Sequence, residues 1–284
     1  MRIELYFELE KNIIPSDNRA MFVSFLKKTL EECNQGKYYE HYFTGTDRKD
    51  YCFVPLFDKP QYEKDKIILA SPRLKLIFSA SDKSKIGQIF YFAFIGMKHK
   101  RFPLPDQNSM ILKKIVKVQE EVITSDKVIF RTVPGGGLII REHFRENNTD
   151  NYYTINDKEF EEKAGDSLKR QAIYAGFAEN EVQEIKIKTI SGKKVVTRIY
   201  KQFIDISIGF FLIEAKPEIL QYFYQVGVGG HSSMGCTIVM YIRNWMRAIS
   251  YWGIKDLLIK QYLSCQIKQS MILMENYLKV RNKS

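Results

Sequence analysis

The order of strand-like and helix-like segments is the feature that most constrains the fold of this 284-residue chain. Residues 2–8 alternate polar and apolar side chains, as a half-buried strand does, and residues 19–33 place apolar side chains at helical spacing. The segments that follow are a strand-like run at 51–57, an expected strand pair within 66–79, a helix at 82–97 and strand-like sequence at 109–122. Strand, helix, strand, strand, helix, strand is the order of a ferredoxin-like domain.

The same order recurs in the rest of the chain. A strand-like segment at 127–141, interrupted by Pro134-Gly-Gly-Gly137, precedes a predicted amphipathic helix at 157–176. Ser191-Gly192 has the composition of a hairpin turn and divides two predicted strands. Those strands span 184–190 and 194–204, and a further strand, a short helix and a closing strand are expected at 205–214, 217–224 and 238–242.

These elements predict an α+β protein with tandem ferredoxin-like (RRM-like) domains. The expected domains are residues 1–122 and residues 123–242, and a helical extension follows at 243–284. In the extension, Trp245, Ile249 and Trp252 are spaced like one side of a helix. That helix would pack on the body or dock a partner, or the extension would be unrelated to the fold.

The charge of the chain favours a polyanionic partner. Its 44 Lys and Arg and 33 Asp and Glu give a net charge of +11, and eight basic and two acidic residues lie in 241–284. RNA, DNA and an acidic membrane surface would all be attracted. No segment has the roughly 18 uncharged apolar residues of a membrane span. With no signal peptide in the opening residues, we expect a cytoplasmic protein.

The cysteines do not predict a metal site or a disulfide framework. They are far apart in sequence and form no CxxC pair, which suits a reducing compartment. They are Cys33, Cys52, Cys236 and Cys265. Paired carboxylates at metal-ligand spacing are also missing, so two-metal phosphoryl chemistry is not expected, and no cofactor is predicted.

The most specific segment is the glycine-rich run that begins at Val226 and ends at Val239. Four glycines in nine residues, between a predicted helix and a predicted strand, let backbone amides approach an anionic ligand. A dinucleotide fingerprint needs the reverse order, strand then helix, and a P-loop ends in Gly-Lys-Ser/Thr, which this run lacks. The alternative is an ordinary glycine-rich turn.

Gly227-Val-Gly229, followed by Gly235, resembles the C-terminal glycine loop of the repeat-associated (RAMP) superfamily of RNA-binding proteins. Within that superfamily, the chain resembles the endoribonucleases that process CRISPR precursor RNA, over about residues 1–240. Other features that agree are Arg2-Ile-Glu-Leu, Ile14-Pro15, Asn18-Arg19 and Val133-Pro134. Two positions depart from the family pattern: Thr237 stands where another glycine is usual, and His231 where Lys or Arg is common.

The resemblance implies a metal-independent endoribonuclease that cleaves CRISPR repeat RNA. Its products would carry a 2′,3′-cyclic phosphate and a 5′-hydroxyl, and its partners would be repeat RNA and, through the guide, other subunits of an effector complex. A second hypothesis is a non-catalytic RNA-binding subunit of such a complex. A third is a basic adaptor that acts through the C-terminal helix.

Metal-free RNA cleavage needs a base, an acid and positive charge near the phosphate. Histidine suits both proton roles because its ordinary pKa lies near working pH. The histidines are His41, His99, His143 and His231. The resemblance implies that His41, in the predicted loop after the first helix, is catalytic. It assigns the family's catalytic lysine to Lys49, with Arg48 as a possible substitute. The alternative for His41 is a solvated loop residue.

Family members can carry a tyrosine in the first helix, about fifteen residues before the histidine. Counting back from His41 reaches Leu26–Lys27, so no tyrosine matches. Lys27 could supply charge there, and Tyr38, Tyr39 or Tyr42 could approach from the loop.

Two sets of residues are predicted to bind RNA. The glycine loop contributes Gly227, Gly229, Gly230, His231 and Gly235, and the hairpin 184–203 contributes Lys186, Lys188, Lys193, Lys194 and Arg198. Lys186 and Lys188 lie two residues apart and therefore share one face of a strand. Such a row can follow phosphates, and the alternative is a solvated strand face.

Overall fold

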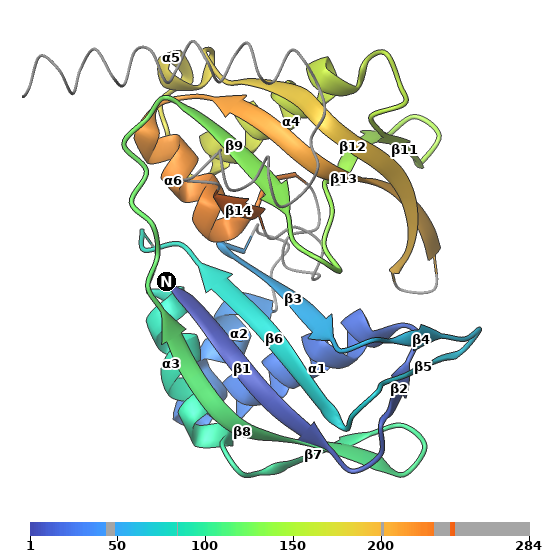
Figure 1. Cartoon of the computed structure of the whole chain (residues 1–284). Helices are drawn as coiled ribbons and strands as arrows, with labels where there is room; N and C mark the ends of the chain where they lie inside the picture. The colour runs from blue at the N-terminus through green and yellow to red at the C-terminus, as the bar shows by residue number, and fades with distance from the viewer. Residues whose placement is uncertain (44–48, 84, 200–201, 230–238, 242–284) are drawn as a thin grey trace, which may run out of the picture. The chain divides into compact units, whose positions relative to one another are not determined.

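The computed structural model describes residues 1–43, 49–83, 85–199, 202–229 and 239–241 (Figure 1). Met1–Tyr241 form one compact unit. Among the described residues, no helix combines the length and the apolar character that a membrane span requires. The predicted extension at 243–284 lies outside the described residues, as do Arg48, Gly230, His231 and Gly235.

The N-terminal half is built around strand β1 (Arg2–Leu9), in which the predicted alternation is present. Ile3, Leu5 and Phe7 are buried on one face of the sheet. The sheet is antiparallel, in the order β3-β6-β1-β8-β7. The other strands are β3 (Tyr51–Phe57), β6 (Arg73–Ala80), β8 (Asn108–Val118) and the added edge strand β7 (Arg101–Leu104).

Two helices, α1 (Asn18–Glu31) and α3 (Ile86–Met97), cover one face of this sheet (Figure 1). Phe25 of α1 is at the centre of the core that they close. Its ring centroid lies 5.1 Å from that of Phe7 and 6.3 Å from that of Phe94. Strand order and helix placement are those of a ferredoxin-like domain, as the sequence predicts.

The predicted loop after α1 contains a further helix, α2 (Lys37–Phe43), preceded by one 3₁₀ turn, η1 (Asn34–Gly36). The prediction of a polar loop there was wrong. Tyr38, Tyr39 and Tyr42 pack against the N-terminal core, so tertiary contacts hold a helix that is too short to be stable alone. His41 therefore lies in a helix and not in a loop.

The C-terminal half repeats the arrangement around strand β9 (Lys127–Thr132). Its antiparallel sheet has the order β12-β13-β9-β14, and its helices are α4 and α6. The bounds are β12 (Lys186–Ile199), β13 (Gln202–Glu214), β14 (Val239–Tyr241), α4 (Phe160–Tyr174) and α6 (Pro217–Val226). Phe130, Leu168 and Phe223 are fully buried in a second apolar core. The chain thus folds as an α+β protein with two ferredoxin-like halves.

The predicted hairpin turn at Ser191-Gly192 was wrong. Strand β12 continues through both residues to Ile199, with an irregularity in its pairing near Ser191. Gly192 lies opposite Gly209 of β13, and a Cβ on Gly192 would lie 2.5 Å from the Ile208 carbonyl oxygen. The glycine is there because two backbones approach closely, which is the other meaning of a glycine inside a strand.

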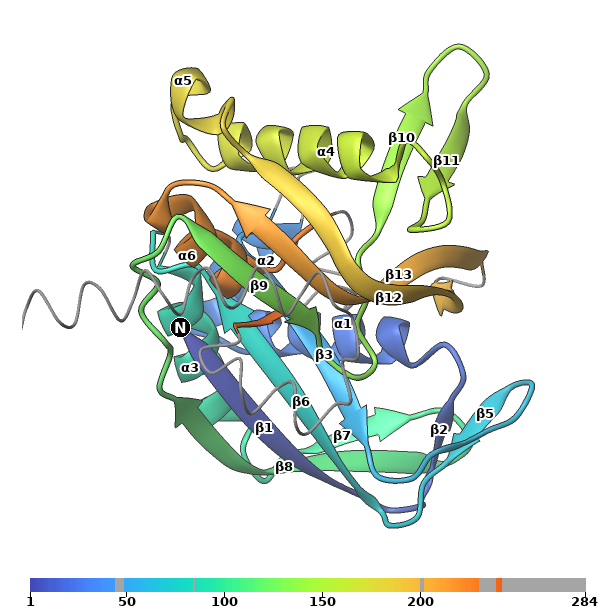
Figure 2. The same cartoon turned by 45° about the horizontal axis from the view of Figure 1, so that its top comes forward.

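Three smaller elements complete the described chain. A hairpin of β10 (Ile140–Phe144) and β11 (Thr149–Tyr153) precedes α4 and lies at one of its ends (Figure 2). A short helix, α5 (Glu179–Val182), follows α4. The third is a small sheet of β2 (Ile13–Pro15), β5 (Lys66–Ile68) and β4 (Gln61–Tyr62).

Candidate functional site

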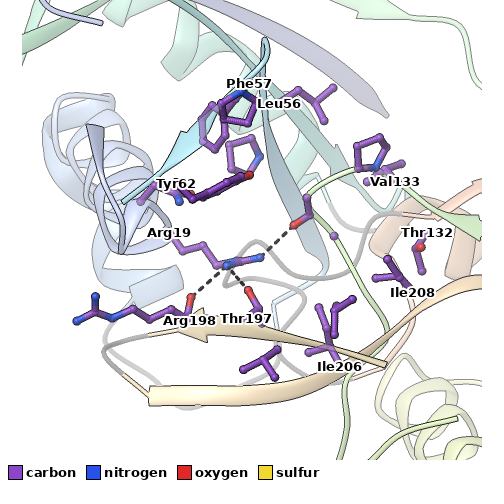
Figure 3. A pocket seen from close by; sticks show the side chains of 18 of the residues that line it. Arg19, Leu56, Phe57, Tyr62, Thr132, Val133, Thr197, Arg198, Ile206 and Ile208 are labelled. Carbon is purple, nitrogen blue, oxygen red and sulfur yellow. Dashed lines mark hydrogen bonds between the residues drawn. The ribbon is translucent and has the colours of Figure 1, made fainter. Parts of the chain in front are cut away.

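A groove of about 1090 Å³ lies between the two halves of the compact unit (Figure 3). Its N-terminal wall comes from the start of α1, the end of β3 and the segment around β4. Its C-terminal wall comes from residues 131–136 and the middle of β12 and β13. Residues distant in sequence therefore share one surface.

The groove is rich in positive charge. Of the residues that the structure describes, five cationic side chains and one carboxylate, that of Glu63, line it. Burial lowers the pKa of the Arg131 guanidinium from a very high ordinary value. The cations are Arg19, Lys64, Arg131, Lys193 and Arg198. A surface of this sign attracts a polyanion.

Exposed aromatic rings lie beside these cations. Tyr62 is 72% exposed and Phe203 is 76% exposed, which is unusual for large rings in a folded domain. The Arg198 guanidinium lies 6.0 Å from the centroid of the Phe203 ring. Rings that stack on bases, next to cations that meet phosphates, are the usual surface for an unpaired nucleic-acid strand.

Arg19 ties the two walls together (Figure 3). Its side chain is buried, and its Nη2 donates to the Gly135 carbonyl at 3.0 Å. Its Nη1 donates to the Thr197 hydroxyl at 3.0 Å and to the Arg198 carbonyl at 3.1 Å. Arg198 makes a contact in the opposite direction: its Nη1 donates to the hydroxyl of Ser16, in the N-terminal half, at 3.0 Å. The two arginines fix the position of one wall against the other.

The five basic residues that were predicted to bind RNA from the hairpin 184–203 have different surroundings in the structure. Lys193 and Arg198 line the groove, and Arg198 is engaged with the N-terminal half. Lys194 forms an ion pair with Asp205 at 2.7 Å. Lys186 and Lys188 are exposed on the edge strand β12, outside the groove lining, and alternate with the buried Ile187 as the spacing predicts.

Two predicted catalytic lysines meet at α2. Lys27 of α1 lies with its Nζ 5.6 Å from the centroid of the Phe43 ring, and the Nζ of Lys49 lies 5.4 Å from the same centroid. Phe43 is two residues after His41 in α2. The structure thus brings both lysines to the helix that contains the predicted histidine.

A polar cluster that the sequence does not reveal adjoins Lys49. Asp50 accepts a hydrogen bond of 3.1 Å from the hydroxyl of Tyr222, which lies on α6 in the other half. Burial raises the pKa of the Tyr42 hydroxyl, and Tyr38 and Asp50 raise it further. The raised pKa keeps the Tyr42 hydroxyl in its neutral form. No periodicity in the sequence links Tyr222 to Asp50, because they are far apart in the chain.

The glycine-rich loop begins where α6 ends. Gly227 and Gly229 both have positive φ, 78° and 87°. The Gly227 amide donates to the Phe223 carbonyl at 2.9 Å, and the Gly229 amide donates to the Gln171 side chain at 3.1 Å. Both amides predicted to meet phosphate are therefore already bonded within the protein. Among the described residues, no cluster of His, Cys, Asp and Glu could hold a metal ion.

Residues 117–240 match the model of the C-terminal domain of the CRISPR-associated protein Cas6. The C-terminal half of the chain is therefore similar to the C-terminal domain of Cas6. The matched region contains the C-terminal wall of the groove, Gln171 and the glycine-rich loop. Lys27, His41 and Lys49 lie outside it, so only the fold relates them to Cas6. No curated protein sequence matches the chain.

Solved structures support the same fold over the whole compact unit. A Cas6-related protein of Pyrococcus furiosus matches with a TM-score of 0.71 at 18% identity, covering 86% of this chain and 99% of its own. A RAMP protein described as binding different RNA substrates matches with a TM-score of 0.68 at 18% identity, covering 86% and 100%. A CRISPR-associated Cas6 protein matches with a TM-score of 0.63 at 17% identity, covering 86% and 99%.

Proposed function

We propose that this Cas6-like protein binds CRISPR repeat RNA and cleaves it without a metal ion. The proposal rests above all on Lys27 and Lys49, which come from separate elements and meet at the helix that holds His41. Similarity of residues 117–240 to the C-terminal domain of Cas6 suggests the class of substrate. The cationic and aromatic groove supplies a surface on which RNA can lie.

In the binding step, the groove takes an unpaired segment of the repeat. Phosphates approach Lys193 and Arg131, and bases stack on the exposed rings of Tyr62 and Phe203. Neither kind of contact reads a base edge, so the groove contributes affinity more than sequence preference.

In the cleavage step, the RNA supplies its own nucleophile. A base takes the proton of the 2′-hydroxyl, the 2′-oxygen bonds to phosphorus, and the bond from phosphorus to the 5′-oxygen breaks. An acid returns a proton to that 5′-oxygen, which leaves a 2′,3′-cyclic phosphate and a 5′-hydroxyl. We assign proton transfer to His41, which as base receives the proton of the 2′-hydroxyl and as acid gives that proton to the 5′-oxygen. Lys27 and Lys49 stabilise the extra negative charge that develops on the phosphoryl oxygens.

We expect Phe203→Ala to weaken binding of repeat RNA by roughly 5- to 150-fold, the loss of one base stack of ~1–3 kcal/mol. The salt dependence of binding should not change, because the ring carries no charge. Lys193→Gln should lower affinity and also reduce the salt slope by about one. Fluorescence anisotropy at several salt concentrations measures both quantities.

Phe92→Ala is the matched control, because Phe92 is 68% exposed on α3 and does not line the groove. Its affinity should equal that of the unaltered protein. Equal affinities for all three variants would remove the groove from the RNA path. Tight binding by a protein that does not cleave would favour the other candidate, a non-catalytic RNA-binding subunit that carries the guide into an effector complex.

A further inference from the structure

Helix α3 is apolar on its outer side as well as on the side that packs against the sheet. Its 12 residues include no charged side chain and one amide, that of Gln88. The ring of Phe92 is 68% exposed and the side chain of Ile95 is 48% exposed. A helix at the surface of a globular protein normally has charged and polar residues on this side. The outer side of α3 therefore has the wrong composition for permanent contact with water.

The neighbouring helix α1 is a reference for an uncovered helix in this protein. It covers the same face of the same sheet as α3 (Figure 1). Its exposed side chains are Ser24, Lys28 and Glu31, all of them polar or charged. Both helices bury apolar side chains in the core, so the core does not explain the difference between their outer sides. An exposed apolar patch of this kind is typical of a surface that another molecule covers.

Gly96 makes a hollow in this apolar surface, one helical turn after Phe92. A Cβ on Gly96 would meet nothing within 4 Å, and its φ lies outside the left-handed region. Neither packing nor backbone conformation therefore requires a glycine, although glycine stabilises a helix less than alanine does. A partner helix would gain from the hollow, because a ridge of side chains can enter it beside the Phe92 ring.

Positive charge lies at both ends of this surface. Lys85 is the N-cap of α3 and Lys98 is its C-cap; both are exposed, and neither forms an ion pair with a residue in the described part of the chain. A lysine at the N-terminus opposes the helix dipole, so Lys85 does not stabilise α3. Two carboxylates at these ends are already paired, Asp82 with the N-terminal ammonium at 2.9 Å and Glu32 with Lys100 at 2.8 Å.

These charges decide which molecule fits. Two copies of α3 packed together, in either direction, would bring lysines close to lysines. The extension of this chain has the same sign, because residues 241–284 hold eight basic and two acidic side chains. An apolar segment with carboxylates at both ends would instead pair with Lys85 and Lys98. Charge complementarity therefore favours an acidic protein partner over a second copy or the chain's own extension.

We propose that the outer side of α3 is a docking surface for another protein, which binds through an apolar helical segment flanked by Asp or Glu. Phe92 and Ile95 are the apolar anchors, and Gly96 receives a ridge of the partner helix. Lys85 and Lys98 pair with its carboxylates. None of these five residues lines the groove, so the inference goes beyond RNA binding and cleavage and does not depend on them.

The deciding experiment places the photo-crosslinking amino acid p-benzoylphenylalanine at position 92 of the full chain, in cells that encode the protein. After irradiation, mass spectrometry identifies the crosslinked peptide. We expect an adduct with a different protein, through a segment with apolar residues at helical spacing and more Asp and Glu than Lys and Arg. The same amino acid at position 174 is the control, since Tyr174 is 79% exposed on α4, and it should not form this adduct.

The charge requirement is tested in the chain that holds the crosslinker at position 92. Lys85→Glu together with Lys98→Glu should lower the yield of the adduct by at least roughly tenfold, because like charges then face each other. Lys158→Glu together with Lys169→Glu makes the same change of net charge away from α3 and should leave the yield unchanged. Equal yields from both double variants would overturn the proposal. So would the absence of an adduct with another protein, or adducts only with a second copy, with residues 243–284 or with lipid.

A measurement on the purified full chain tests whether the surface is free of the chain itself. Phe92→Glu should change the melting temperature no more than Tyr174→Glu does, because both rings are exposed. A fall of about 4 °C or more for Phe92→Glu alone would show that this chain covers its own α3, and would contradict the proposal.

Discussion

His41→Ala is expected to lower the rate of repeat cleavage by roughly 10²–10⁴-fold, the usual cost of losing a general acid or base. RNA affinity should stay close to that of the unaltered protein, because a general acid or base acts on the chemical step and the proposed binding surface is formed by the cations and rings of the groove. Single-turnover cleavage with saturating protein measures the chemical step separately from binding.

His99→Asn is the control, since His99 is exposed at the end of α3 and has a positive φ that asparagine tolerates. This variant should cleave at the normal rate. A His41→Ala protein with full activity would remove His41 from the mechanism, and the two lysines at Phe43 would then need another proton carrier.

Arg19→Met is expected to lower the free energy of unfolding by about 2–4 kcal/mol. The guanidinium makes three hydrogen bonds from the N-terminal half to the C-terminal half, and the side chain is 8% exposed. Its removal leaves the Gly135 and Arg198 carbonyls without this donor. Arg19→Lys should restore little, because one ammonium cannot reproduce the planar fork that reaches all three acceptors.

Urea unfolding followed by circular dichroism measures the change. Lys28→Met is the control on the same helix: Lys28 is half exposed and pairs with Glu31 and Glu32, so its loss should change stability by no more than about 0.5 kcal/mol. Equal midpoints for the two variants would show that Arg19 does not hold the halves together.

Local patterns were sufficient to predict both ferredoxin-like halves. Strand β3 has the predicted bounds, because its two ends are marked by polar residues and its interior is apolar. Patterns failed where a distant partner decides the structure. Ser191-Gly192 has turn composition, and only Gly209 across the sheet explains why the strand continues.

The candidate site was only partly predictable, because distant partners decide which residues meet there. Lys27, His41 and Lys49 were proposed from a resemblance, and the structure brings the two lysines together. The groove was not predictable, because its rings and cations come from segments that meet only in three dimensions.

Two short motifs that had supported only the family resemblance make contacts that explain their residues physically. Arg19, at the entry to the first helix, donates to Gly135, the neighbour of Pro134. Arg2, in the opening strand, donates to the Tyr224 carbonyl at 2.9 Å. Each motif therefore holds one half of the protein against the other.

The most direct test of the account is incubation of the full chain with CRISPR repeat RNA in excess EDTA, with mapping of the product ends. We predict cleavage at one position within the repeat, at the same rate as without EDTA. The upstream product should carry a 2′,3′-cyclic phosphate and the downstream product a 5′-hydroxyl. Cleavage that requires added Mg²⁺, or that leaves a 5′-phosphate, would contradict the assignment of the chemistry to His41, Lys27 and Lys49.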